Sequence, residues 1–405
     1  MHQTIPSPDD LMQSGPGPLV RPISAGVVSA LVGFTSSFVV VLAGLTSVGA
    51  NPSQAASGLL AVTVMGGLSC ILLATWTRIP ITVAWSTPGA ALLASTAAVQ
   101  GGWPAAVGAF LVTGGLIVLT GLVPQLGALV AGIPTSVAQA MLAGVLFQLC
   151  LGPITALEAN PLAVAPILAT WLVALRLRPR WAAPLAFVAA AVVIIVDLAV
   201  SGTPIDLSTL APRVDLTVPV FTLAGAVGIA VPLYLVTMAG QNVPGVAVMK
   251  GLGYEIPWRR ALLATGVGTA LAAPAGGHAI NLGAISAALA AGPEAGDDRS
   301  RRWVASVTAG VVYVLLGIAS AAFGTLVLLG PVGVIPAVAG LALLTTLAAS
   351  LQAALAVPEE RIPAVVTFAT AASGLVVAGV SAAFWAILAG LVVRAVLRWG
   401  QEPGV

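Results

Sequence analysis

Long apolar runs, separated by short polar or Pro- and Gly-rich stretches, constrain the fold of this chain more than any other feature. Charged side chains make up 7% of the 405 residues, against about 25% in a typical soluble domain. So few charges cannot cover the surface of a water-soluble fold of this length. The sequence therefore predicts an all-α polytopic membrane protein.

Dividing the apolar runs at Pro, Gly and charged clusters gives about 14 transmembrane segments, each near the length that a helix needs to cross the hydrocarbon layer. The first seven are expected near 24–48, 53–76, 80–98, 103–123, 131–151, 160–176 and 181–200. The second seven are expected near 219–243, 258–274, 276–291, 303–329, 332–350, 363–379 and 381–399. Residues 1–22 are polar and rich in Pro and Gly, and we expect them to form a disordered cytoplasmic arm.

The positions of the basic residues support this division. With a cytoplasmic N-terminus and a crossing at every segment, 14 of the 15 Lys and Arg residues fall on the cytoplasmic side, and Arg213 is the exception. This is the distribution that the positive-inside rule predicts. Both termini are therefore expected to be cytoplasmic.

Two consecutive halves of seven segments, 23–200 and 219–399, must have opposite orientations because seven is odd. Inverted repeats of this kind are typical of secondary transporters, which bind substrate near the midplane at broken helices. The third segment, IPITVAWSTPGAALLAS (79–95), and the tenth, APAGGHAINLGAISAALA (273–290), correspond between the halves. Each has Pro or Gly, then a ring, a polar cluster and a run of small residues.

We interpret both segments as a short extended stretch followed by a half-helix. Ser86 or Thr87 is the predicted N-cap in the third segment, with Pro88 at the first helical position, and Asn281 has the capping role in the tenth. Non-helical backbone at membrane depth is tolerated where it is buried in protein or lines a cavity. Two half-helix N-termini directed at one cavity would form an anion site. The alternative is that Gly and Pro only allow close helix packing.

Few polar side chains lie at membrane depth. His278 follows the break in the tenth segment, and an imidazole has an unperturbed pKa of about 6.5, so it could bind a proton with the substrate. The alternative is a neutral His that bonds to a backbone carbonyl. In the eighth segment Gln241 and Asn242 stand before Pro244, and either a ligand or a neighbouring helix could satisfy their amides.

Other predicted contacts with a flat apolar substrate are Trp85 at the first break, Phe38, and the hydroxyl of Ser36. Each of these could equally be part of the core. Cys70 and Cys150 lie within apolar runs, and the sequence shows no metal-ligand spacing, Walker loop or nucleophile elbow. We therefore expect no metal, no cofactor, no nucleic-acid partner and no enzymatic activity.

With these residues in view, the sequence resembles the benzoate transporter (BenE) family of bacterial inner-membrane symporters. The resemblance rests on LYLVTMAGQNVPGVAVM, on APAGGHAINLGAISAALAAGPEA and on DDRSRRWVASVTAGVVYVLLG, and it extends from about Arg21 to Arg398. The family is similar in architecture to uracil, sulphate and bicarbonate transporters with a seven-plus-seven inverted repeat.

In that fold one set of spans forms a core and the other a gate, which implies a core at about 24–123 and 219–329 and a gate at about 124–200 and 332–399. The resemblance also implies a substrate site at Trp85, Ser86 and Thr87 of the third span, Gln241 of the eighth, and His278 with Asn281 of the tenth. Uracil-type relatives have carboxylates on spans eight and ten where this chain has Gln241 and His278. An amide and an imidazole would not repel an anionic substrate.

The sequence as a whole predicts a transporter of the bacterial inner membrane that imports benzoate or a similar aromatic carboxylate with a proton. The predicted substrate-binding residues are Trp85, Ser86, Thr87, Gln241, Asn242, His278, Asn281, Ser36 and Phe38, and His278 is the predicted proton-coupling group. The alternatives are transport of another small anion or a nucleobase on the same fold, and an anion channel. Relatives of this fold often dimerise, so the resemblance allows a homodimer.

Overall fold

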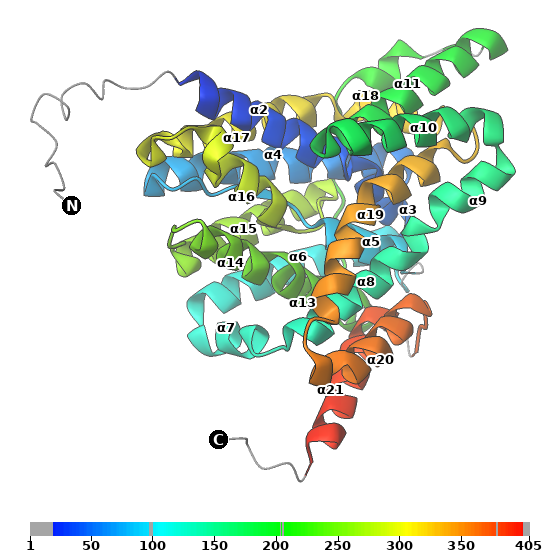
Figure 1. Cartoon of the computed structure of the whole chain (residues 1–405). Coiled ribbons are helices and arrows are strands. Elements are labelled where there is room, and N and C mark those ends of the chain that lie inside the picture. Colours follow the sequence, from blue (N-terminus) through cyan, green and yellow to red (C-terminus); the bar gives the residue numbers. More distant parts are fainter. Residues whose placement is uncertain (1–18, 97–99, 203, 205, 378–379, 400–405) are drawn as a thin grey trace, which may run out of the picture.

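Helices form nearly all of the computed structural model, which describes residues 19–96, 100–202, 204, 206–377 and 380–399 (Figure 1). The predicted arm therefore lies outside the described residues, apart from 19–22. The first half contains α2 (Val20–Thr35), α3 (Phe38–Ser47), α4 (Pro52–Thr77), β1 (Val83–Trp85), α5 (Thr87–Ala94), α6 (Gly102–Leu122), α7 (Pro124–Ala131), α8 (Thr135–Cys150), α9 (Gly152–Ala159), α10 (Pro161–Leu177) and α11 (Ala182–Ser201).

The second half begins with one long helix that two π-helical turns interrupt. It comprises α12 (Leu223–Gly225), the π turn η3 (Ala226–Ala230), α13 (Val231–Thr237), the π turn η4 (Met238–Asn242) and α14 (Val243–Gly251). After it come α15 (Trp258–Ala272), β2 (Ile280–Leu282), α16 (Ala284–Ala291), α17 (Trp303–Ile318), α18 (Ser320–Leu328), α19 (Val334–Ala354), α20 (Arg361–Ala372) and α21 (Ala382–Arg398).

These elements follow the predicted segments in order. Among the described residues, eight helical stretches are long and apolar enough to cross a membrane by themselves, and the other predicted segments are shorter or broken. The tenth segment, for example, is divided between the strand β2 and the half-helix α16. The polytopic helical fold is thus as predicted, while the number of 14 crossings stays a prediction.

The two broken segments meet as a two-stranded antiparallel sheet. Val83 of β1 pairs with Leu282 of β2, Ala84 with Asn281, and Trp85 with Ile280. The predicted extended stretch followed by a half-helix is therefore present in both segments. Since the strands are antiparallel, α5 and α16 leave the sheet in opposite directions.

Side chains from neighbouring helices satisfy backbone groups that the sheet leaves unpaired. The amide of Ile280 donates to Thr269 Oγ1 on α15 at 3.1 Å, and the amide of Leu282 donates to Asn242 Oδ1 on η4 at 2.9 Å. On the other strand, the amide of Val83 donates to Cys70 Sγ on α4 at 2.9 Å. A buried backbone amide without a partner is costly, so these side chains are part of what makes the broken spans stable.

Two details of the predicted caps are wrong. Thr87 is the first residue of α5 and Pro88 the second, although Ser86 is the N-cap as expected. Asn281 does not cap α16, because it pairs with Ala84 in the sheet, and the N-cap is Gly283. The strand thus runs two residues further than the sequence suggests.

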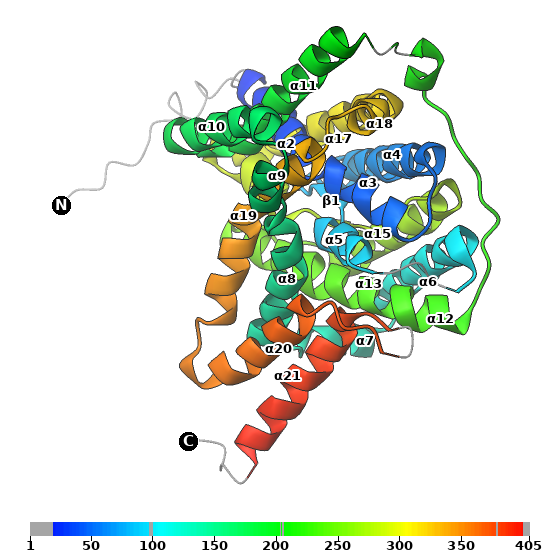
Figure 2. The ribbon, with the colours of Figure 1, turned by 90° about the vertical axis from the view of Figure 1, so that its right-hand side faces the viewer.

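The helices pack in two groups. In one, α4 packs against α17, α2 against α17, and α6 against α15; in the other, α8 packs against α19 and α20, and α10 against α11. Figure 2 shows the second group as a column from α10 down to α21 beside the first. Close contacts at glycine make this packing possible, since a Cβ on Gly67 of α4 would lie 2.5 Å from the carbonyl oxygen of Gly310 on α17.

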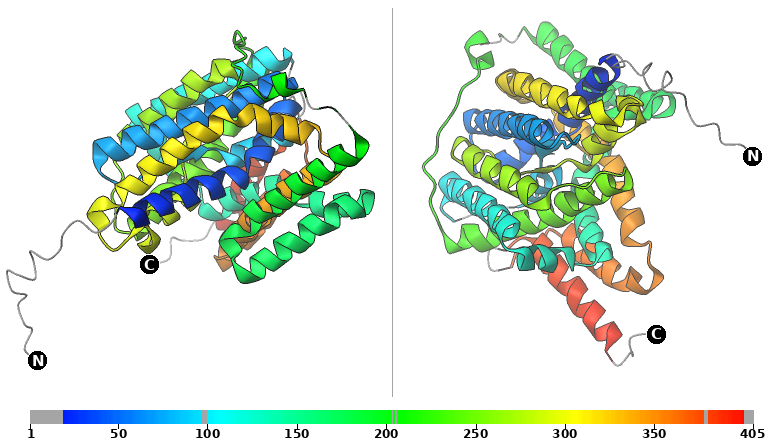
Figure 3. Two further views of the ribbon diagram at one scale, coloured as in Figure 1. Left: turned by 90° about the horizontal axis from the view of Figure 1, so that it is seen from above. Right: turned by 90° about the vertical axis from the view of Figure 1, so that its left-hand side faces the viewer.

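The described part of the connection between α11 and α12, residues 206–222, runs along one edge of the molecule, where Figure 3 shows it as a green loop. It is held to the first group of helices. The amide of Thr217 donates to the carbonyl of Pro274, and the indole of Trp103 donates to Thr217 Oγ1 at 2.9 Å. This loop joins the two sequence halves.

We predict that Thr269→Val destabilises the protein by about 1–3 kcal/mol, because valine keeps the shape of threonine but leaves the buried amide of Ile280 without an acceptor. Thr63→Val is the matched control, since Thr63 is equally buried and its hydroxyl bonds only within its own helix. Denaturant unfolding in detergent measures both. Equal loss of stability in the two variants would contradict the role given to Thr269.

Candidate functional site

A pocket opens beside the strand pair, between the two groups of helices. Its lining comes from α2, β1, α5, η4, β2, α16 and α17 on one side, and from α8 and α19 on the other. Part of the space in the pocket is continuous with the outside. A mainly apolar lining with a few directed polar groups is typical of small-molecule sites.

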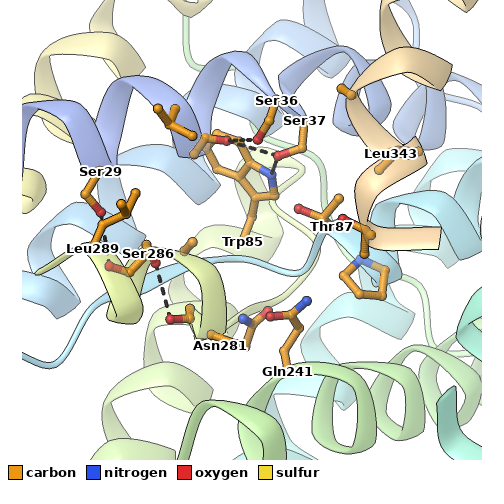
Figure 4. Close-up of a pocket in the computed structure, with 18 of the residues that line it drawn as sticks. Ser29, Ser36, Ser37, Trp85, Thr87, Gln241, Asn281, Ser286, Leu289 and Leu343 are labelled. Carbon is orange, nitrogen blue, oxygen red and sulfur yellow. Dashed lines mark hydrogen bonds between the residues drawn. The ribbon is translucent and has the colours of Figure 1, made fainter. Parts of the chain in front are cut away.

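Five of the nine predicted substrate-binding residues line this pocket: Ser36, Trp85, Thr87, Gln241 and Asn281. Figure 4 shows them around one space, with Gln241 and Asn281 directed toward one another on the side opposite Ser36. The structure thus brings together residues from the first, third, eighth and tenth predicted spans. Ser86, Asn242, His278 and Phe38 are fully buried and lie outside the lining.

Ser86 holds the start of α5. Its Oγ accepts from the amide of Gly89 at 3.1 Å and from the hydroxyl of Thr237 on α13 at 2.9 Å. Its own amide donates to the carbonyl of Ala279, next to β2. Ser86 therefore ties the half-helix to the opposite strand and to the eighth segment.

Trp85 is fixed by the break in the first segment. Its indole Nε1 donates to Ser37 Oγ at 3.0 Å, and the hydroxyls of Ser36 and Ser37 both donate to the carbonyl of Gly33. Phe38 stacks on Phe34 with 5.2 Å between ring centroids, and so belongs to the core behind the pocket.

The π turn η4 contains two neighbouring amide side chains, Gln241 and Asn242, with different surroundings. Asn242 is buried, and besides accepting from Leu282 it donates to Met238 Sδ at 3.1 Å. Gln241 is half-buried, and its side chain faces the pocket. Such turns widen a helix by one residue and are frequent at functional sites. Of the two interpretations that the sequence left open, contact with neighbouring protein groups applies to Asn242, while Gln241 is available to a ligand.

His278 lies behind the Ser86 turn. Its Nε2 is 3.1 Å from the carbonyl oxygen of Ser86, and its ring centroid is 6.5 Å from that of Phe110. A carbonyl only accepts, so Nε2 carries the hydrogen. Nδ1 is buried and has no partner in the described part of the chain. The described arrangement is therefore a neutral imidazole that supports the backbone at the start of α5.

Tyr313 on α17 is a site residue that the sequence analysis missed. It lines the pocket beside Trp85, with 6.0 Å between ring centroids, and its buried hydroxyl has no hydrogen-bond partner among the described residues. Gly33 makes room for it, since a Cβ on Gly33 would lie 2.3 Å from that hydroxyl oxygen. The sequence contains no local signal for a contact between residues 280 positions apart.

No formally charged side chain occurs among the described residues that line the pocket. Its polar groups are hydroxyls, amides, an indole and the first backbone amides of two half-helices. At α5, Pro88 has no N–H and Gly89 donates to Ser86, whereas no side chain caps the first turn of α16. The start of α16 therefore has the freer donors for a ligand's oxygen atoms.

Known proteins resemble the chain over nearly its full length. The family model described as benzoate membrane transport protein (BenE) matches residues 19–396. The inner membrane protein YdcO of Escherichia coli (strain K12) is 37% identical over 375 residues, which are 92% of this chain and 95% of that protein. The benzoate membrane transport protein of Acinetobacter baylyi (strain ATCC 33305 / BD413 / ADP1) is 29% identical over 373 residues, which are 92% and 94%.

A solved structure agrees in fold. The transmembrane domain of a cyanobacterium bicarbonate transporter, BicA, matches with a TM-score of 0.57 and 15% identity, over 94% of this chain and 97% of that chain. At this identity the likeness concerns the fold alone. The predicted resemblance to the BenE family and to bicarbonate-transporter architecture is confirmed.

We predict that Gly33→Ala impairs both stability and ligand binding, because the added methyl group collides with the Tyr313 hydroxyl. Tyr313→Phe removes that oxygen and leaves the nearest ring carbon 3.5 Å from the new methyl group, an ordinary contact. In a double-mutant cycle measured by thermal unfolding, Gly33→Ala should therefore cost much less when Tyr313 is already phenylalanine. An equal cost in both backgrounds would disprove the contact.

Proposed function

Because the chain belongs to the family of benzoate membrane transport proteins, we propose that this multi-pass membrane protein imports benzoate or a similar aromatic carboxylate together with a proton. The single observation that supports this proposal best is the pocket, in which a polar end at the broken helices adjoins apolar walls. An aromatic ring that carries one carboxyl group likewise has one polar end and an apolar remainder.

The carboxyl group would lie at the starts of the two half-helices. Thr87, Gln241 and Asn281 provide hydroxyl and amide groups there, and the first turn of α16 adds backbone N–H groups. The free N–H groups at a helix N-terminus donate hydrogen bonds to a ligand's oxygen atoms. The site would thus bind a carboxyl group without a lysine or arginine.

The ring would lie against apolar and aromatic side chains. Trp85 closes one wall, while Leu146 of α8 and Leu343 of α19 contribute from the other group of helices. Burial of one aromatic ring contributes about 25 cal/mol per Å² of apolar surface. Shape on this side would decide which substituted benzoates fit.

Transport would follow from movement of one group of helices against the other. We propose that residues 24–123 and 219–329 form the core, and that 124–200 and 332–399 form the gate. The pocket draws its lining from both, so a displacement between them would open it to one side of the membrane and then to the other. The protein would act in the bacterial inner membrane with both termini cytoplasmic, in line with its relative named as an inner membrane protein.

Uptake of labelled benzoate into proteoliposomes tests the function. With an inward proton gradient we expect accumulation, and with unlabelled benzoate inside we expect trans-stimulated exchange, which a channel does not show. Nucleobases and small inorganic anions are the competing substrates. Uptake of a nucleobase without uptake of any aromatic carboxylate would refute the proposal.

Gln241→Ala should reduce benzoate uptake by tenfold or more while the protein remains folded, because the amide that faces the pocket is lost. Gln148→Ala is the matched control, since Gln148 lies on α8 outside the lining, and its amide donates to the carbonyl of Ala372. Initial uptake rates and surface expression are compared for both. Wild-type uptake by Gln241→Ala would remove Gln241 from the site.

His278 has two candidate roles here. It supports the start of α5 through the carbonyl of Ser86, and the sequence also predicts it as the group that carries the coupling proton. We expect His278→Ala to cripple uptake without loss of folded protein. Full proton-driven uptake by this variant would exclude a coupling role.

A further inference from the structure

Some group must bind the coupling proton while the transporter holds its substrate, but no Asp, Glu, Lys, Arg or His lines the pocket in the described part of the chain. Arg21 lies in the first turn of α2 and Lys250 in the last turn of α14, so these charges are at helix ends. On the helices and strands that line the pocket, or that pack against those elements, the titratable and charged groups are Arg21, Cys70, Cys150, Glu158, Arg176, Asp197, Tyr234, Lys250, Arg259, Arg260, Glu294, Arg299, Arg301, Tyr313, Arg361, Arg394 and Arg398. At the ends of these elements or next to them are Arg78, His278, Arg302 and Glu360. Of these, Tyr313 alone lines the pocket.

The side chain of Asn281 has an unused acceptor in the pocket wall. Its Nδ2 is 2.7 Å from the carbonyl oxygen of Leu282, and only an N–H can face a carbonyl at that distance, so the orientation of the amide is fixed. The other end, Oδ1, is then a hydrogen-bond acceptor. Asn281 is 1% exposed, and Oδ1 has no partner among the described residues. Buried polar atoms in proteins nearly always have a hydrogen-bond partner, so a donor is expected opposite this oxygen.

An ionised carboxylate cannot supply that donor, because both of its oxygens only accept. A protonated carboxyl group has one O–H donor and one carbonyl acceptor. Gly283, two residues beyond Asn281, is the N-cap of α16 and donates its own N–H to the carbonyl of Thr82, so the free N–H groups of the uncapped first turn begin at Ala284, which also lines the pocket. These N–H groups suit the carbonyl oxygen of an acid.

We propose that the coupling proton travels on the substrate, which binds as the neutral carboxylic acid with its O–H donated to Asn281 Oδ1 and its C=O accepting from the start of α16. The proton comes from water and adds to one carboxylate oxygen on one side of the membrane. It returns to water from the same oxygen on the other side. No bond to carbon is made or broken. This inference rests on the proposed function and specifies the form of the substrate.

His278 is the competing carrier. Its Nε2–H is already committed to the carbonyl of Ser86, and its ring lies beside Phe110, outside the pocket lining. A second proton on Nδ1 would place a full charge on a buried ring whose new N–H has no acceptor among the described residues. Of the two unpaired acceptors, His278 Nδ1 and Asn281 Oδ1, the one whose residue lines the pocket is Asn281 Oδ1.

The proposal has a quantitative consequence for affinity. A carboxyl group has an ordinary pKa of about 4, so about one molecule in 1,000 is protonated at pH 7. If only the acid binds, the apparent Kd for benzoate rises about tenfold per pH unit. Benzamide has both a donor and an acceptor at the same positions and does not ionise, so its Kd should not change with pH.

Calorimetric titration of the purified full-length protein in nanodiscs tests this consequence. Benzoate and benzamide are titrated at pH 6, 7 and 8, in two buffers with different ionisation enthalpies at each pH. We expect about one proton to be taken up per benzoate bound, a tenfold rise in Kd per pH unit, and pH-independent binding of benzamide. A Kd for benzoate that is constant from pH 6 to 8 would overturn the proposal, as would benzamide that fails to bind.

The variant His278→Gln separates the two carriers, since glutamine keeps an N–H donor for the carbonyl of Ser86 but cannot gain a charge. The proton uptake and the pH slope should persist in this variant, even where the absolute affinity changes. Their disappearance would assign the proton to His278. If folded wild-type protein binds no aromatic carboxylate at any pH, the proposed function itself fails, which is a different result from binding without proton uptake.

Discussion

The antiparallel pairing of Val83–Trp85 with Ile280–Leu282 is the interaction on which the rest of the structure depends. A chain that leaves the helical state inside a membrane protein must find partners for its backbone groups among protein atoms. Each broken segment supplies half of those partners to the other, and neither break could be stable alone. The other partners are the side chains of Cys70, Thr269 and Asn242, which fixes where α4, α15 and η4 must pack. The inverted repeat thus has a physical reason at its centre, because a second break is what makes the first one possible.

The same pairing divides the polar residues at membrane depth into two sets. Ser86, Asn242 and His278 are turned toward backbone groups of the sheet and its flanks, and they hold the architecture. Gln241, Asn281 and Thr87 face the pocket and keep hydrogen-bonding capacity for a ligand. Neighbouring residues can fall in different sets, as Gln241 and Asn242 of η4 do, because successive side chains of a helix point in different directions. If the proposed function is right, transport would depend on the first set indirectly and on the second directly.

The sequence predicts those features that local chemistry decides. The polar cluster after Trp85 indicated a cap at Ser86 or Thr87, and Ser86 is that cap. The two breaks were predictable from Pro and Gly, and five of the nine residues predicted to bind substrate line the pocket. Asn281 was assigned to a cap because nothing local shows that its strand pairs with Ala84, 197 residues earlier. Tyr313 was missed for the same reason, because its place in the pocket depends on Gly33, far away in the chain. The surroundings of Asn281 and Tyr313 depend on contacts with distant parts of the chain, which the local sequence does not show.

An uncharged pocket also suits the cycle of a transporter. A site that alternates between the two faces of a membrane must return empty, and a fixed charge in it would have to move through the membrane field at about 2.3 kcal/mol per 100 mV. With amides, hydroxyls and helix starts in place of ionised side chains, the empty site carries no such charge across. A substrate that enters as its neutral acid adds none. The loaded and the empty transporter would then respond alike to the membrane potential, and the proton gradient, rather than the potential, would set the direction of transport.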